Sequence, residues 1–308
     1  TSMRRSHTSP DDDGMLLGFA EAMAQTTTPL PQIPGLTVRA APCKTILNKG
    51  GISDYSLNCY TGCSHACAYC YARYMLSFHP HAEPWGRFVD VKTNAVEMLE
   101  RQLRSTQPGH VFVSSACDGW QPLEEHLQLT RRCCERLIQH GFTLFCLTKN
   151  SLIQRDFDLF AGKPVTVGVT LTTMNDALRA EIEPGTSSVA ERVRVLREAK
   201  AAGLRTNVMF GPLLPGLSDG EQALGELFEC AADCGVDSIT TDALNLRSGV
   251  WPALSEFLTR YHPRLLPLYR RILFKPEHRE AYLRDLRERI QTAASRGAVD
   301  TMLSGHEA

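Results

Sequence analysis

The sequence has no long hydrophobic run: none approaches the ~20 apolar residues that a membrane-spanning helix needs. It also lacks an excess of charge of either sign, with 33 Lys and Arg against 34 Asp and Glu and a net charge of -1. Proteins that bind nucleic acid through its phosphates usually carry a basic excess. The composition therefore argues against a membrane protein and disfavours a dedicated nucleic-acid-binding protein.

A secretory signal is also missing, because no charged stretch followed by an apolar core opens the chain. The eleven cysteines are an odd number, which fits reduced thiols better than a framework of disulfides. At 43% hydrophobic and 22% charged residues, the composition is that of an ordinary globular protein. We therefore expect a cytoplasmic protein.

Three regions follow from the changes in composition along the chain. Residues 1–42 contain an acidic run, a threonine run and several prolines, and we expect them to form a flexible tail. Residues 43–247 show alternating strand and helix patterns. Residues 248–308 are charged and helical in pattern, with acid-before-base pairs four residues apart that stabilise an exposed helix. We expect this last region to be a helical C-terminal extension.

The central region predicts repeated β/α units, because short apolar runs alternate with longer amphipathic ones. Strands are predicted near 55–60, 110–116, 142–148, 164–171, 204–210 and 236–242. Helices are predicted near 93–105, 123–139, 153–160, 188–202 and 219–234. An eight-fold barrel takes ~250 residues, so six units need roughly 190. The length therefore fits a partial (β/α)6 barrel of the TIM type, an α/β fold.

Three cysteines, Cys63, Cys67 and Cys70, follow the first predicted strand with the spacing C-x3-C-x2-C. Thiolates in a tight loop are the ligands of iron–sulfur clusters. A [4Fe–4S] cube normally takes four thiolates, so three would leave one iron open to a reactive ligand. Two alternatives remain: three core cysteines on one helical face, and a zinc site with His65 as the fourth ligand.

This cysteine loop resembles the signature of the radical S-adenosylmethionine (SAM) superfamily. The resemblance implies that the open iron binds SAM and that an electron from the cluster cleaves a carbon–sulfur bond. It also implies a six-unit partial barrel, in agreement with the strand and helix pattern. The cofactors would be a [4Fe–4S] cluster and SAM. A reducing partner such as flavodoxin or ferredoxin would supply the electron.

Polar residues follow several predicted strands, where the reactive groups of a β/α barrel stand. The second strand leads into Ser114–Pro122, the third into Leu147–Asn150, the fourth into Thr170–Thr173 and the sixth into Thr240–Asp242. Together these side chains would line one cavity that suits a polar ligand such as SAM.

Within the superfamily, residues 44–247 resemble the spore photoproduct lyase-like branch. The marks are in Asn58–Arg73, Val91–Asn94, Asp118–Pro122, Thr148–Lys149, Glu183–Pro184 and Gly211–Asp219. The resemblance implies that Tyr69 lies at the SAM adenine and that Tyr71 belongs to a radical relay. It also implies SAM contacts from three further residues, namely Asp118, Lys149 and Thr170.

One departure from that branch concerns the hydrogen-donating cysteine of the lyase, whose position is Ser115 here. Cys117 stands two residues later, where the lyase has a SAM-contacting serine. We expect Ser115 to contact SAM and take Cys117, with Tyr71, as a candidate for moving hydrogen. A buried structural thiol at Cys117 is an equally weighted alternative, and the departure weakens the case for lyase activity.

Cys133 and Cys134 fit one broad apolar face of a predicted helix, so we expect both to pack in the core. The alternative is a site for arsenite or a soft metal. Some unusual radical SAM enzymes pass the 3-amino-3-carboxypropyl group of SAM to arsenic.

The sequence thus predicts a radical SAM [4Fe–4S] enzyme, of lyase or transferase type, that reductively cleaves SAM and modifies an unidentified substrate. A small molecule or a peptide is favoured by the net charge of -1. The alternatives are nucleic-acid photoproduct repair, 3-amino-3-carboxypropyl transfer to arsenite, and a non-catalytic electron-transfer module. An electron carrier needs no SAM pocket, so Lys149 and Thr170 speak against the last of these.

Overall fold

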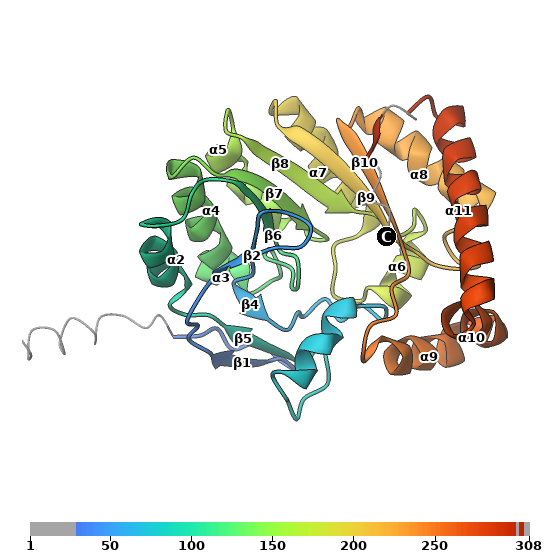
Figure 1. The fold of residues 1–308 in the computed structure, drawn as a ribbon, viewed down its shortest axis with the longest axis horizontal. Coiled ribbons are helices and arrows are strands. Elements are labelled where there is room, and N and C mark those ends of the chain that lie inside the picture. Colours follow the sequence, from blue (N-terminus) through green and yellow to red (C-terminus); the bar gives the residue numbers. More distant parts are fainter. Residues whose placement is uncertain (1–28, 300–301, 305–308) are drawn as a thin grey trace, which may run out of the picture.

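The computed structural model describes residues 29–299 and 302–304, and its main feature is a curved eight-stranded sheet (Figure 1). Six of its strands lie side by side in chain order and run parallel to their neighbours. They are β3 (Tyr55–Leu57), β6 (His110–Val113), β7 (Thr143–Thr148), β8 (Val165–Thr170), β9 (Arg205–Leu213) and β10 (Ser238–Ala243). The short strands β2 (Leu47–Lys49) and β11 (Leu303–Ser304) form the two edges. The predicted six-unit partial barrel is confirmed.

Helices cover the outer face of this sheet (Figure 1). They are α2 (Ala95–Leu103), α4 (Leu129–Gln139), α7 (Val189–Ala201) and α8 (Glu221–Cys234). A short 3-10 helix, η2 (Ser151–Asp156), leads directly into α5 (Phe157–Phe160). Because helices cover one face and the barrel interior the other, β8 is buried along nearly its whole length. Its valine-rich sequence suits that position.

The helix predicted over 123–139 is interrupted at Gln128, which adopts a left-handed conformation with φ of 47°. A single turn, α3 (Glu124–Leu127), precedes the break, and α4 follows it. The buried carboxylate of Glu124 accepts hydrogen bonds from the backbone N–H groups of Leu129 (3.0 Å) and Arg131 (3.1 Å). Glu124 thus caps α4 from within the preceding turn.

The prediction of a single strand over residues 55–60 is wrong in one respect, because the chain leaves the main sheet after Leu57. Asn58 accepts a hydrogen bond from the backbone N–H of Ala116 (2.7 Å) and donates one to Ser115 Oγ (2.9 Å). These bonds turn the chain into a second, three-stranded sheet. It consists of β1 (Thr37–Ala40), β5 (Phe88–Val91) and β4 (Tyr60–Thr61), in that order.

Most of the predicted tail lies outside the described residues, since the description begins at residue 29. Within the expected tail of residues 1–42, however, β1 pairs in parallel with β5. The predicted boundary at residue 43 is therefore too late. The strand is only four residues long and half exposed, so its sequence carries no clear alternation of apolar and polar residues.

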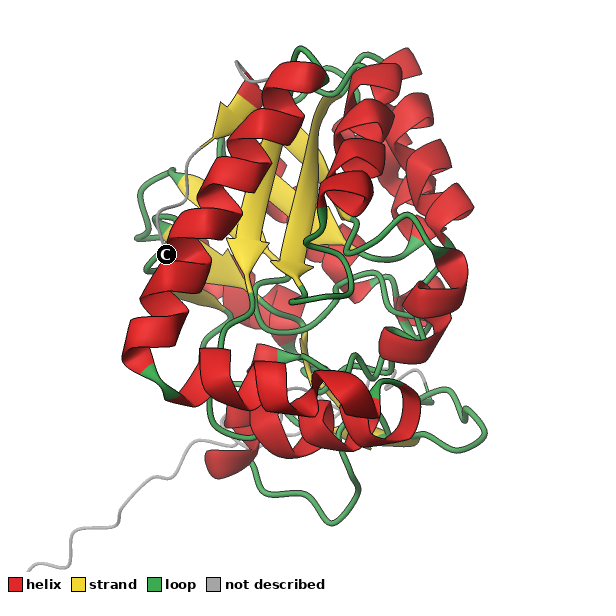
Figure 2. Ribbon diagram, turned by 90° about the vertical axis from the view of Figure 1, so that its right-hand side faces the viewer, coloured by secondary structure: helices red, strands yellow, loops and turns green. Residues whose placement is uncertain are grey.

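The C-terminal region is helical, as expected, and lies beyond the C-terminal ends of the strands before returning along one side (Figure 2). It contains α9 (Val250–Tyr261), η3 (Pro263–Leu265), α10 (Leu266–Phe274) and α11 (Pro276–Arg296). Helix α11 packs on α8, and α9 contacts both α6 (Asp176–Ile182) and η1 (Tyr71–Ser77). Within the described residues, no helix is both long and apolar enough to cross a bilayer.

Candidate active site

The loop that carries the three cysteines, residues 62–70, connects β4 to η1 at the C-terminal end of the barrel. It is tied to the barrel from two sides. Gln121, in the loop after β6, accepts a hydrogen bond from the backbone N–H of Ser64 (3.0 Å). On the other side, Ala68 N–H donates to Ile182 O (2.9 Å) and Gly185 N–H donates to His65 O (3.1 Å). Hydrogen bonds from two sides therefore fix the cysteine loop on the barrel.

Cys63 and Cys67 are buried, Cys70 is partly buried, and none of the three is in a disulfide. Burial raises the pKa of all three thiols, and that of Cys67 is about 12. The positive charge of Lys149 is the largest influence that lowers the pKa of Cys67 against the effect of burial. Lys149 and Arg73 likewise lower the pKa of Cys70. Positive charge thus lies where deprotonated thiolates would need it.

The donors around the loop fit an iron–sulfur cluster better than a single ion. Nε of Arg73 is buried and has no hydrogen-bond partner among the described residues. The buried indole N–H of Trp85 faces the Cys70 side chain and favours its thiolate. Trp85 packs in the same apolar cluster as Cys63 and Cys70. Anionic sulfur would give these donors an acceptor. In the described part of the chain, no three Cys, His, Asp or Glu residues are placed to hold one metal ion. A cube binds each thiolate through a different iron and so needs the sulfurs further apart.

His65 does not take the place of a fourth ligand. Its ring is buried, with Nδ1 3.4 Å from Asp118 Oδ2 and Nε2 3.4 Å from Asn150 Nδ2. Both ring nitrogens therefore face partners in the barrel. This arrangement speaks against the zinc alternative, which needs a free imidazole nitrogen.

Asp118 and Lys149 lie together, at the ends of neighbouring strands β6 and β7. The two carboxylate oxygens of Asp118 accept hydrogen bonds from Thr148 Oγ1 (2.8 Å), Lys149 N (2.8 Å) and Trp120 N (2.9 Å). Burial disfavours the ammonium of Lys149, but Cys67, Glu183 and Asp118 outweigh it, so the pKa of Lys149 is raised. The geometry gives Asp118 the task of positioning the loop that carries a charged lysine.

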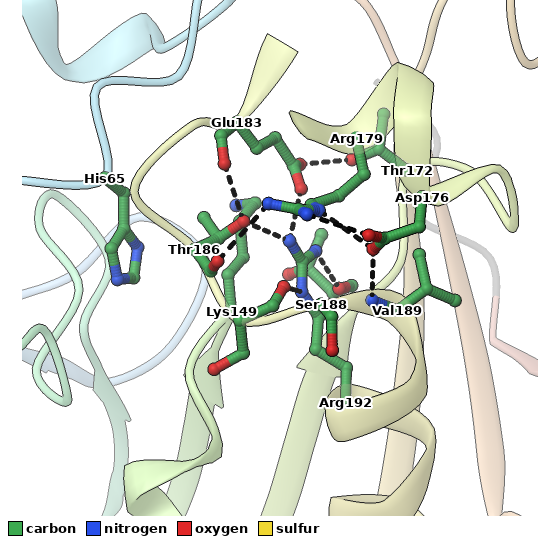
Figure 3. A network of polar contacts seen from close by, with 12 residues as sticks. His65, Lys149, Thr172, Asp176, Arg179, Glu183, Thr186, Ser188, Val189 and Arg192 are labelled. Carbon is green, nitrogen blue, oxygen red and sulfur yellow. Dashed lines mark hydrogen bonds and ion pairs between the residues drawn. The ribbon is translucent and has the colours of Figure 1, made fainter. Parts of the chain in front are cut away.

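Tyr69 belongs to a buried polar network, part of which Figure 3 shows. Its hydroxyl donates to Glu183 Oε1 and lies 3.2 Å from Thr172 Oγ1. Arg192 pairs with Glu183 at 2.5 Å, and both side chains are at most 1% exposed. Burial alone would raise the pKa of Glu183, but Arg192 and then Lys149 lower it to about 2. Glu183 is therefore ionised at neutral pH and anchors the cysteine loop through the hydroxyl of Tyr69.

Thr170 lies at the end of β8, and its carbonyl accepts a hydrogen bond from Arg192 Nη1 (3.0 Å). Lys149 Nζ lies 5.8 Å from the centre of the Tyr69 ring. The predicted SAM contacts Tyr69, Lys149 and Thr170 are thus brought together around one buried arginine. Asp118 joins them through Lys149.

A second group stands at the end of β6 and contains Ser115, Cys117 and Tyr71. The hydroxyl of Tyr71, which is 40% exposed, donates to Ser115 O. Cys117 is buried, and its Sγ lies 3.7 Å from Asn58 Oδ1. Burial raises the pKa of Cys117 to about 12, so this thiol keeps its hydrogen at neutral pH.

Cys133 and Cys134 are fully buried in the main hydrophobic core, and the prediction of core packing is confirmed. Cys133 Sγ lies 3.8 Å from Cys59 Sγ. Such a pair behaves as small apolar side chains in contact. Neither thiol reaches a surface from which arsenite could bind.

The sequence reasoning missed four residues that hold the site: Asn58, Gln121, Glu183 and Arg192. Asn58, Gln121 and Glu183 lie within the marks of resemblance, but the sequence assigned none of them a role. Nothing in the sequence marked Arg192 as a site residue, because an arginine in the first turns of a helix is common. Glu183 follows α6 directly, and its carboxylate accepts a hydrogen bond from Thr172, which lies just after β8. This position, after a helix and next to a strand end, is the signal that could have identified it.

Gly185 gives a first testable prediction, because a Cβ there would lie 2.3 Å from Ser64 O and 2.7 Å from His65 Cα. Both are backbone atoms of the cysteine loop. We expect Gly185→Ala to displace that loop at a cost of ~1–3 kcal/mol and to lower the iron retained after reconstitution. The control is Gly225→Ala in α8, where a Cβ meets nothing within 4 Å. It should keep all its iron and gain about 0.5–1 kcal/mol of stability. Equal iron retention in both variants would contradict the prediction.

Comparison with known proteins adds three findings. Residues 57–228 match the family model described as the radical SAM superfamily. An uncharacterized protein of Mycobacterium tuberculosis is 33% identical over 91% of this chain and 87% of its own length. A protein of Pseudomonas phage M6, named radical SAM Nalpha-GlyT isomerase, is 24% identical over 67% of this chain and 42% of its own length.

Among solved structures, a spore photoproduct lyase mutant superposes with a TM-score of 0.66 at 14% identity. The superposition covers 96% of this chain and 95% of the lyase chain. At that identity the likeness extends to the fold, and it includes the C-terminal helices as well as the barrel.

Proposed function

This chain belongs to the radical SAM superfamily, and we propose that it cleaves SAM reductively and removes or returns a hydrogen atom on a second substrate. A [4Fe–4S] cluster and SAM are the cofactors of this superfamily enzyme. Bound together, they supply the one-electron cleavage of a carbon–sulfur bond. The observation that carries the proposal is the loop of three free thiols, two buried and one partly buried, whose Tyr69 ring lies beside Lys149 at the end of β7.

Cys63, Cys67 and Cys70 would hold the cluster, and the surrounding residues would keep it in place. Nε of Arg73 would donate toward its sulfur atoms, since it is buried without a partner in the described chain. The N–H of Trp85, which faces the Cys70 side chain, would do the same. Gln121 and the segment around Gly185 fix the loop on its two sides. A rigid loop costs little reorganisation when charge on the cluster changes.

Lys149, Tyr69 and Thr170, with Ser115 at the neighbouring strand end, would form the SAM site. A charged ammonium next to the cluster suits the carboxylate of SAM. Asp118 is better placed to position Lys149 than to contact SAM, because its oxygens already accept three hydrogen bonds from this chain. Its role in the proposal is therefore that of a positioning residue.

Cys117 and Tyr71 remain the candidates for moving hydrogen. Tyr71, at the start of η1, contacts the loop after β6 that carries Cys117, since its hydroxyl donates to the carbonyl of Ser115, two residues before Cys117. A thiol that keeps its hydrogen at neutral pH can donate a hydrogen atom, and a nearby phenol can replace it. This favours a reaction in which hydrogen is returned to the substrate.

The substrate class favoured by the net charge of -1 is a small molecule or a peptide. The phage relative named radical SAM Nalpha-GlyT isomerase supports a second candidate, an isomerisation. Repair of a nucleic-acid photoproduct rests on the fold likeness to spore photoproduct lyase and is weakened by Ser115. Aminocarboxypropyl transfer to arsenite is weakened by the burial of Cys133 and Cys134.

The reconstituted protein, incubated anaerobically with dithionite and SAM, should form 5′-deoxyadenosine, which liquid chromatography with mass spectrometry measures. We expect Lys149→Met to reduce this product by about tenfold to a hundredfold, as the loss of an ion pair to a bound carboxylate does. The control is Lys163→Met, an exposed lysine after α5. Methylthioadenosine as the main product would favour aminocarboxypropyl transfer. No cleavage at all would favour an electron carrier and contradict the proposal.

A further inference from the structure

The C-terminal helices enclose a groove whose chemistry the proposed function does not use. The groove measures about 660 Å³. Its walls come from α9, α10 and the start of α11, and they include Trp251, Arg270, Arg271, Phe274, Lys275 and His278. We call it the cationic groove. No strand-end residue lines it, so an occupant would touch the helical layer and not the barrel interior.

The charge of the cationic groove is not balanced by the protein. From residue 260 to residue 279 the chain has six Arg or Lys and a single carboxylate, Glu277. None of the ion pairs within the described residues involves Arg270, Arg271 or Lys275. All three are exposed. A concentration of free cations on a chain with a net charge of -1 indicates an acidic partner.

Two aromatic rings give the same groove an apolar centre. Phe274 is 53% exposed, and its ring meets that of Trp251 edge to face at 5.1 Å between centroids. Exposed aromatic side chains ringed by arginine are typical of the energetic centre of a protein interface. The groove therefore has the composition of a docking surface as well as its charge.

The helices that form the cationic groove also back the cysteine loop. Trp251 packs against the apolar cluster that contains Cys67, Tyr69 and, at its edge, Cys70. In the same cluster, α9 contributes Leu254, Phe257 and Leu258, and α10 contributes Tyr269 and Leu273. The cationic groove and the predicted cluster ligands thus border the same apolar cluster.

We propose that the cationic groove is the docking surface for an acidic one-electron donor protein of the flavodoxin or ferredoxin class. The proposal rests on the proposed function, because only a cluster that must be reduced needs such a donor. One electron passes from the donor, which is oxidised, to the cluster, which is reduced, and no atom is transferred. A substrate has to enter the barrel, whereas an electron donor needs only to come close to the cysteine loop from outside.

Nucleic acid is the competing occupant, since it is also anionic and stacks on aromatic rings. The observations favour the donor because the cationic groove is lined only by the helical layer, while the nucleotide to be modified would have to reach the strand ends. The chain also lacks the overall basic charge of a protein that follows a phosphate backbone.

The test compares two variants of the full reconstituted chain with the same loss of charge. Arg270→Gln with Arg271→Gln removes two cations from the cationic groove. Arg284→Gln with Arg287→Gln removes two exposed cations from α11. Each protein is titrated by calorimetry with a bacterial flavodoxin and with a ferredoxin, at two salt concentrations. We expect the groove variant to bind the donor about tenfold more weakly, with a shallower salt dependence, and the control to bind like the original chain.

Equal weakening in both variants, or no binding of either donor by the original chain, would overturn the docking surface. So would tight binding of single-stranded oligothymidylate that the groove variant loses while donor binding is unchanged. Formation of 5′-deoxyadenosine with dithionite is measured separately, because dithionite needs no docking surface. If dithionite also yields no product, the proposed function fails, and the titration still decides whether the groove binds the donor.

Discussion

Replacing Cys63, Cys67 and Cys70 together by alanine should abolish the iron–sulfur cluster, reducing bound iron from about four atoms per chain to background. The three thiols are the only cysteines of the cysteine loop, and each would bind a different iron. Cys133 and Cys134 do not replace them, because both are enclosed in the core. Iron and sulfide analysis after anaerobic reconstitution, with the visible absorption spectrum, measures the loss.

The matched control removes the same number of thiols elsewhere: Cys43→Ala, Cys230→Ala and Cys234→Ala. Cys230 and Cys234 lie in α8, where alanine is a good helix former, and Cys43 is only partly buried. This variant should keep its iron. Full retention of iron by the first variant, with a normal spectrum, would show that the cysteine loop is not the cluster site.

The barrel could be predicted because parallel strands covered on both faces have a distinctive composition. The run Val165–Thr170 is mostly β-branched, and the structure buries nearly all of it. The helices between such strands must be amphipathic, so the alternation of the two patterns fixed the number of units. The strands that escaped prediction, β1, β2, β5 and β11, are only two to four residues long. Segments that short lack a readable period.

The candidate site could be predicted where chemistry depends on local spacing or on position after a strand. The cysteine loop is a contiguous motif, and Asp118 and Lys149 follow strands that pair with each other. Because neighbouring parallel strands end at the same edge, the two residues had to lie close together. Which of them contacts a ligand and which positions its neighbour depends on hydrogen bonds that the sequence does not display.

The parts that escaped prediction depend on turns between elements. Glu183 and Arg192 are nine residues apart in the sequence, and neither helix nor strand periodicity would place them in contact. Only the turn between α6 and α7 does so, and the capping box of Ser188 and Glu191 fixes where α7 begins. Asn58 likewise looks like an ordinary residue at a strand end. Its amide joins that end to the loop after β6, a contact across 57 residues or more.

Arg192→Ala should destabilise the protein by about 3–5 kcal/mol, because it leaves the carboxylate of Glu183 buried without its partner. Arg192 also donates to the carbonyls of Ser187 (2.9 Å) and Thr170 (3.0 Å) and to the hydroxyl of Thr186, so four acceptors lose a donor at once. The midpoint of urea unfolding, with the slope unchanged, measures the loss. Arg194→Ala is the control: it lies two residues away on α7, is exposed, and should change stability by no more than about 0.5 kcal/mol.

A double variant, Arg192→Met with Glu183→Leu, separates the buried charge from the network's effect on the site. Removing both charges avoids the uncompensated carboxylate, so this variant should be more stable than Arg192→Ala. It nevertheless takes away the acceptor of the Tyr69 hydroxyl, next to Cys70 in the cysteine loop. We therefore expect recovered stability together with reduced formation of 5′-deoxyadenosine. A double variant that cleaves SAM as fast as the original chain would limit Glu183 and Arg192 to stabilising the fold. A single variant that loses less than about 1 kcal/mol would contradict the buried ion pair itself.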